Sequence, residues 1–80
     1  MHSRLKDVHP LPGFRLSVRF TDGVEGVYDA SLLPHLHPAF KALQDIPGLF
    51  ECARVDTGGY GIVWNDEIDL DADAVRACLE

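Results

Sequence analysis

The fold is decided by the stretch Phe14-Arg15-Leu16-Ser17-Val18-Arg19-Phe20, in which apolar and polar residues alternate without exception. Successive side chains of a β-strand point to opposite faces of a sheet, so the four apolar side chains share one face. The stretch therefore predicts a strand with that face on a hydrophobic core. Arg15, Ser17 and Arg19 lie on the other face, in water.

The segments on either side of this strand predict two more strands. Asp22-Gly23 follows it, and such a pair adopts the positive φ angles that a tight hairpin needs. Residues 24–28 are then the return strand. Upstream, residues 5–9 predict a shorter strand that ends at Pro10, because proline lacks the N–H group of a strand ladder.

Helical segments are predicted at three places by capping residues and by proline. Asp29 caps a helical turn that includes Leu32 and Leu33. A helix over residues 38–44 begins at a proline, which is favourable in the first helical position. Asp71 is the expected N-cap of a last helix over residues 72–79.

Two further strands are predicted over residues 50–56 and 60–64, and Ile68 and Leu70 continue the alternation briefly. The order is strand-strand-strand-helix-strand-strand-helix. Consecutive strands joined by tight turns pair antiparallel. The sequence therefore predicts the α+β class, with a small antiparallel sheet of about five short strands and two short helices packed on it.

Length and composition predict one domain, over residues 1–80, that stays in the cytoplasm. The chain has 80 residues and is 46% apolar, as is usual for a globular protein. No stretch approaches the roughly 18–20 apolar residues of a membrane span. The first seven residues lack the apolar stretch of a secretory signal. Cys52 and Cys78 are expected to be free thiols packed as small apolar side chains, with a disulfide between them as the open alternative.

The charge is acidic and unevenly distributed. The net charge is −6, and residues 1–20 carry four basic side chains against one carboxylate, whereas residues 21–80 carry three against twelve. Such a surface repels nucleic acid over most of its area, so the composition favours a small, basic protein as the partner. Unpaired edges of a small sheet leave a homodimer as a further alternative.

One acidic segment is similar to the opening of a calcium-binding loop. Asp69, Asp71 and Asp73 stand at alternate positions, and Glu80 falls at the twelfth, where such loops place a bidentate ligand. The sixth position is Ala74, where the loop needs glycine for a sharp turn. The segment is therefore interpreted as an acidic helix start.

No catalytic, metal or cofactor site is expected in the rest of the chain. His35 and His37 lie between prolines, and a zinc site would need two more ligands from scattered positions such as Cys52. No cysteine or serine stands in a motif of nucleophilic catalysis. We therefore expect that the protein is not an enzyme.

Four residues form a candidate interaction surface. Arg15 and Arg19 lie on the solvent face of the long strand, either as ordinary solvated side chains or as a contact for phosphate or for an acidic partner. Tyr60 and Trp64 share one side of their predicted strand. They belong to the core or, where they are exposed, anchor an interface.

The order and spacing of several motifs extend over residues 5–79. They are Phe20-x-Asp22-Gly23, Tyr28-Asp29, Phe40-x-x-Leu43, Phe50, Ile62-x-Trp64 and Ile68-Asp69-Leu70. In this order they resemble the bacterial domain of unknown function 2442 family. The resemblance implies a small α+β domain and supplies no catalytic residues.

The resemblance also carries expectations about function. Some family members have a DNA-binding helix-turn-helix after this domain, and the chain ends at Glu80, which leaves no room for that unit. The missing unit argues against a regulator that recognises DNA directly. The resemblance further implies a bacterial gene that lies next to the gene of a second small protein, in a pair of toxin–antitoxin type.

The leading hypothesis is a non-catalytic protein-interaction or regulatory module, the antitoxin-like member of a two-protein pair. One alternative is a nucleic-acid-associated regulator that uses the sheet face of Arg15 and Arg19. A remote alternative is a small metal-binding protein or enzyme that uses the histidines, Cys52 or the aspartates of residues 69–73.

Overall fold

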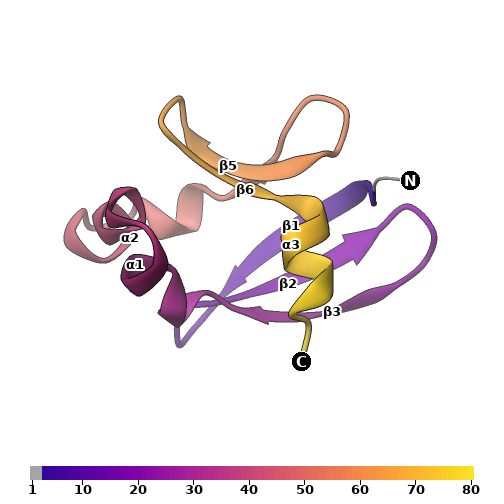
Figure 1. Ribbon diagram of the computed structural model, residues 1–80, viewed down its shortest axis with the longest axis horizontal. Helices are drawn as coiled ribbons and strands as arrows, with labels where there is room; N and C mark the ends of the chain where they lie inside the picture. The colour runs from indigo at the N-terminus through magenta and orange to yellow at the C-terminus, as the bar shows by residue number, and fades with distance from the viewer. Residues whose placement is uncertain (1–2) are drawn as a thin grey trace.

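The chain folds into two three-stranded antiparallel sheets, which lie one above the other in the computed structural model of residues 3–80 (Figure 1). Sheet A has the order β1-β2-β3, and its strands are β1 (Leu5–Leu11), β2 (Arg15–Phe20) and β3 (Glu25–Asp29). Sheet B has the order β4-β5-β6, and its strands are β4 (Arg54–Val55), β5 (Gly61–Asn65) and β6 (Ile68–Asp71).

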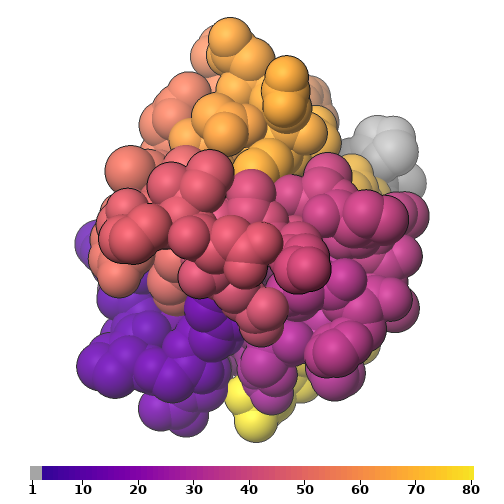
Figure 2. Space-filling view, turned by 90° about the vertical axis from the view of Figure 1, so that its left-hand side faces the viewer, coloured from indigo at the N-terminus to yellow at the C-terminus, as the bar shows by residue number. Residues whose placement is uncertain are grey.

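Short helical segments connect the two sheets and gather on one side of the molecule, which faces the viewer in Figure 2. Between the sheets the chain forms η1 (Ala30–Leu32), α1 (Leu33–Leu36), η2 (Pro38–Lys41), α2 (Ala42–Asp45) and η3 (Phe50–Cys52). After sheet B it ends with α3 (Ala72–Ala77). No helix within residues 3–80 is long and apolar enough to cross a membrane.

The predicted α+β class is confirmed, with six strands rather than about five. The additional strand arises at residues 65–71. Asn65 Oδ1 accepts hydrogen bonds from the backbone N–H groups of Glu67 and Ile68, at 2.9 and 3.0 Å, and so closes a turn. The chain beyond this turn becomes a separate strand, β6, and does not merely continue β5.

The strict alternation has the predicted effect from Arg15 to Phe20, whereas Phe14, which was expected in the strand, lies in the preceding turn with a φ of 62° and is half-buried. Leu16, Val18 and Phe20 are at most 1% exposed, and they belong to a core cluster that also includes residues of sheet B. Arg15 and Arg19 are exposed. The core therefore lies between the two sheets, and the opposite face of sheet A is solvated.

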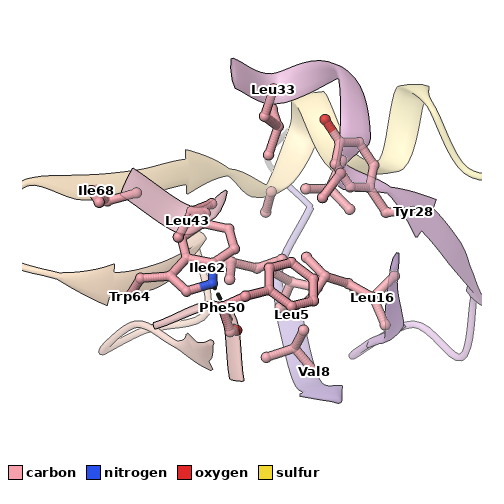
Figure 3. Close-up of a cluster of buried hydrophobic side chains, with 14 of the residues drawn as sticks. Leu5, Val8, Leu16, Tyr28, Leu33, Leu43, Phe50, Ile62, Trp64 and Ile68 are labelled. Carbon is pink, nitrogen blue, oxygen red and sulfur yellow. Dashed lines mark hydrogen bonds between the residues drawn. The ribbon is translucent and has the colours of Figure 1, made fainter. Parts of the chain in front are cut away.

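The strand predicted over residues 50–56 is wrong in most of its length. Residues 50–52 form the helical turn η3, and the strand is reduced to Arg54–Val55. The rings of Phe14 and Phe50 stack with centroids 4.4 Å apart. Figure 3 shows the hydrogen bond that Trp64 Nε1 donates to the Phe50 carbonyl at 3.1 Å. Tertiary contacts thus hold a turn here despite the local preference for a strand. Cys52 is consequently exposed, as is Cys78, so neither thiol is packed as expected, and both are free.

The helical segments before η3 differ from the prediction in detail. The helix expected over residues 38–44 is a 3₁₀ turn that continues as α2 to Asp45, with Phe40 and Leu43 buried as predicted. The helix α1 forms in spite of Pro34, since this proline lies in the first turn, where its missing N–H has no helical partner to lose. The cap predicted at Asp29 is present, because its Oδ1 accepts from Ser31 N at 2.9 Å.

The two sheets are joined at Gly59, which is buried against β1. Leu5 N donates to Gly59 O at 2.7 Å. Gly59 has a φ of 82°, and a Cβ atom at this position would lie 2.6 Å from Leu5 O. A side chain therefore cannot be accommodated without moving β1 away from sheet B.

The helix α3 connects sheet B back to sheet A. Asp71 Oδ2 caps it by accepting from the N–H groups of Asp73 and Ala74, as predicted. At the other end, Arg76 Nη1 donates to Asp22 Oδ2 at 2.8 Å, across to the β2–β3 turn. The backbone N–H of Val24 and the Arg76 side chain together hold the pKa of Asp22 below its ordinary value of 3.8.

We predict that Gly59→Ala destabilises the protein more than Gly23→Ala. Both glycines have a positive φ, but a Cβ at Gly23 meets nothing within 4 Å. Gly23→Ala should lower the free energy of unfolding by about 1 kcal/mol through backbone strain alone, and Gly59→Ala by about 3 kcal/mol or more. Urea denaturation of both variants measures the difference. Equal losses would show that the close approach to Leu5 does not hold the sheets together.

A second prediction concerns the Asp22 carboxylate. A carboxyl group whose pKa is lowered by folding contributes stability at pH values above its unfolded pKa, and this contribution is lost as the pH falls through the folded pKa. Arg76→Gln should raise the pKa of Asp22 toward 3.8, with the Val24 hydrogen bond retained. The pKa of Asp29, lowered mainly by Ser31, should stay unchanged and serves as the internal control. NMR titration of the carboxyl carbons measures both, and an unchanged Asp22 would contradict the role of Arg76.

Candidate functional site

One concave feature is a groove between the helical segments and the β5–β6 hairpin. It consists of two adjoining depressions, of about 410 Å³ and about 500 Å³, which share Ala39, Glu67 and Ile68 as lining residues. The first depression follows β6 toward α3, and the second follows α2. In Figure 2 the orange surface of the hairpin lies directly above the red surface of α2. We call the two depressions together the hairpin groove.

The floor of the hairpin groove is apolar. Phe40 is 6% exposed and its ring meets the ring of Trp64 edge-on, with centroids 6.3 Å apart. Ile68 is 5% exposed and belongs to the core. The floor thus includes core residues and the partly buried Ala42 and Leu70 that pack against them, and the exposed Ala39 and Ile46 extend its apolar surface.

The rim of the hairpin groove is acidic. It carries four exposed carboxylates, those of Asp45, Glu67, Asp69 and Asp71, against one lysine, Lys41, and the side chain of His37. None of the ion pairs within residues 3–80 includes any of these four carboxylates. The four carboxylates thus outnumber the one lysine of the rim, and none of them lies within ion-pair distance of a basic side chain of residues 3–80.

The local structure explains why these carboxylates point outward. The turn held by Asn65 places Glu67 at the tip of the hairpin, where it is exposed. Within β6 the side chains alternate, so Ile68 faces the core and Asp69 faces water. Asp71 is partly engaged as the cap of α3, which leaves its second oxygen at the rim.

Exposed apolar residues lie on the helical side of the molecule beside this groove. Leu32 and Leu36 are 63% and 67% exposed and lie one helical turn apart on η1 and α1. Ile46, which is 51% exposed, lines the groove itself. Clusters of exposed apolar side chains with a polar rim are typical of protein-interaction surfaces.

The predicted arginine surface is a mixed-charge face. In the register of sheet A, Arg19 lies between Asp7 and Glu25, and Arg19 Nε is 3.2 Å from Glu25 Oε2. Arg15 lies opposite Asp29 and helps to keep the pKa of that carboxyl low, after the larger effect of the Ser31 hydrogen bonds. Each arginine therefore has a carboxylate as cross-strand neighbour, and the face has no basic excess.

The two predicted aromatic residues are separated by the structure. Trp64 is 2% exposed and is a core residue, whereas Tyr60 is 51% exposed because β5 begins only at Gly61. The guanidinium of Arg4 lies over the Tyr60 ring, 5.3 Å from its centroid. Tyr60 therefore remains an exposed aromatic next to a cation, while Trp64 supports the groove from beneath through Phe40.

The residues considered for metal binding are not brought together. Within residues 3–80 no three side chains of His, Cys, Asp or Glu gather closely enough to hold an ion. His37 and the first two aspartates of residues 69–73 line the hairpin groove, whereas Asp73 accepts a hydrogen bond from Ser3 N. His35 lies outside the groove lining. Among the described residues the groove therefore presents its carboxylates and the His37 side chain without gathering three of them at one point.

Sequence reasoning did not identify the groove, since its walls come from residues 37–46 and 65–74, which are far apart in the chain. The missed residues are Asp45, Ile46 and Glu67. The sequence signal that points to the groove is the turn at Asn65-Asp66, which carries two consecutive acidic residues, Asp66 and Glu67.

Comparison with known proteins supports the assignment of a family. No curated protein and no solved structure matches the chain. A family model described as "Protein of unknown function (DUF2442)" matches residues 5–77, which include both sheets and the whole hairpin groove. The chain therefore belongs to the DUF2442 family of proteins of unknown function.

Proposed function

We propose that this chain is a non-catalytic, cytoplasmic protein-interaction module, and that its hairpin groove binds a small, basic protein. The observation that carries the proposal is the combination of an apolar floor with an acidic rim whose carboxylates form no ion pair within residues 3–80. An apolar floor stabilises a complex through burial, while the charged rim selects the partner and speeds the encounter.

The proposal extends to a regulatory role as the antitoxin-like member of a two-protein pair. A basic surface is what a protein needs in order to bind the phosphates of nucleic acid. If the carboxylates of Glu67 and Asp69 occupy that surface, the bound partner loses access to its nucleic acid. The chain would then restrain its partner by covering it, without any chemistry of its own.

The mixed-charge face of sheet A gives less support to the alternative of a nucleic-acid-associated regulator. Binding to phosphate requires cationic side chains that are free to release counterions. Arg19 is already paired with Glu25, and Arg15 lies opposite Asp29. That alternative stays a prediction, for which a gel shift at low salt is the direct measurement.

The test is a pull-down with the tagged protein from the organism that carries this gene, at moderate salt. Wild type is compared with the groove variant Glu67→Lys/Asp69→Lys and with the control variant Glu51→Lys/Glu80→Lys. Both variants change the net charge equally, and all four side chains are exposed. We expect wild type and control to recover one small basic protein in stoichiometric amount, and the groove variant to recover about tenfold less.

Two outcomes would contradict the proposal. Equal recovery by both variants would place the partner elsewhere on the surface. Recovery of the bait alone would remove the two-protein pairing, and analytical ultracentrifugation would then decide whether the chain binds a second copy of itself.

A further inference from the structure

We infer that the free edge of β6 is a strand-pairing site, at which an extended, basic segment of the partner joins sheet B as a fourth strand beside Asp69. The inference rests on the proposed function and specifies the form in which the partner is bound. It requires that backbone groups of β6 point into the hairpin groove, that the groove follows this edge, and that the side chains around it select one kind of segment.

The hydrogen-bond pattern of sheet B fixes the direction of these backbone groups. In an antiparallel pair, opposite residues alternate between those that exchange backbone hydrogen bonds and those that do not. Ala72 N donates to Tyr60 O at 2.9 Å, so the next hydrogen-bonded pair along the ladder is Ile62 with Leu70. The pair of Val63 with Asp69 lies between two such positions and exchanges no hydrogen bonds.

The hydrogen bonds between β5 and β4, on the other side of β5, lead independently to the same assignment for Val63 and Asp69. Asp56 N donates to Gly61 O at 3.0 Å, so the polar groups of Gly61 point toward β4 and away from β6. Two residues along, Val63 lies opposite Arg54 in the same β4–β5 ladder. The backbone N–H and C=O of Asp69 therefore point away from β5, and no hydrogen bond within residues 3–80 outside the β5–β6 ladder includes them.

The hairpin groove follows this open edge. Its first depression is lined by the five consecutive residues 67–71, and such a continuous run is expected when a groove lies along the edge of a strand rather than on one face of it. His37 and Phe40 form the facing wall. An edge with unpaired backbone groups is a template for a further strand, and many peptide-binding domains use one in this way.

The side chains around the edge define which segment fits. Asp69 and Asp71 lie on the solvent face of β6, while Ile68 and Leu70 lie on the face toward the core. A strand added beside them would place alternate side chains next to the two carboxylates and the others over Leu70 and Phe40. Opposite charges and apolar pairs in such cross-strand positions are favourable. The segment is therefore one in which basic and apolar residues alternate.

A second copy of this chain does not supply such a segment. Its alternating basic stretch is β2, which is paired with β1 on one side and with β3 on the other. Two hairpin grooves facing each other would also bring like charges together. The charge pattern thus selects a different protein as the source of the added strand.

The test uses an eight-residue peptide in which arginine and valine alternate, titrated into the ¹⁵N-labelled protein. The variants are Asp69→Ala and Asp69→Pro, which lose the same charge and differ in that proline removes the outward N–H. Proline is tolerated on an edge strand whose N–H faces solvent. We expect slower exchange of the Asp69 amide in the wild-type complex, and binding about tenfold weaker for Asp69→Pro than for Asp69→Ala.

A second peptide keeps the test decisive if Asp69→Pro does not fold. It has the same sequence with N-methyl groups on alternate residues, so it keeps its charge and loses the N–H groups of one edge. Wild-type protein should bind it at least tenfold more weakly than the unmodified peptide. Equal binding of the two peptides, or an unprotected Asp69 amide, would overturn strand pairing.

The experiments distinguish a failure of strand pairing from a failure of the proposed function. If the pull-down recovers a basic partner that depends on Glu67 and Asp69 while Asp69 stays unprotected in that complex, the partner uses the rim without adding a strand. If neither peptide binds, strand pairing is overturned whatever the pull-down recovers. If the protein alone dimerises with a protected Asp69 amide, the occupant is a second copy.

Discussion

The arrangement of the two sheets depends on the contact between Gly59 and Leu5. The backbone of Gly59 approaches β1 so closely that the Leu5 amide bonds its carbonyl at 2.7 Å. This contact fixes sheet B above sheet A and so determines the space that the core side chains fill. The groove depends on it in turn, because its floor includes residues of that core, with Phe40 supported by Trp64. A glycine with a positive φ at one turn thus determines where the groove can form.

Those parts of the fold that rest on local chemistry could be predicted from the sequence. The alternation from residue 14 to residue 20 predicts β2 and its buried face, and the carboxylates of Asp29 and Asp71 predict two helix starts. Each of these signals acts within a few residues of the chain, where the preferences of side chains and backbone decide the outcome. Nothing distant competes with them.

The rest could not be predicted because distant contacts decide it. Residues 50–52 have the composition of a strand and form a turn, since Phe50 stacks on Phe14 and its carbonyl accepts a hydrogen bond from Trp64. The charge of the candidate interaction surface also depends on residues that are distant in the sequence. Arg15 and Arg19 are basic along their own strand, but the neighbouring strands supply the carboxylates opposite them. The hairpin groove is assembled from two segments that no local pattern relates to each other.

Glu80, the third residue after α3, covers part of the free edge of sheet A. Glu80 N donates to Val27 O at 2.8 Å, on the outer side of β3, so this part of the edge is occupied by the chain itself (Figure 1). Edge strands with free backbone groups recruit further strands and, when both ends of a molecule are open, allow growth into fibres. The bond from Glu80 to Val27 therefore shortens the part of β3 that is free to pair with a strand of another molecule.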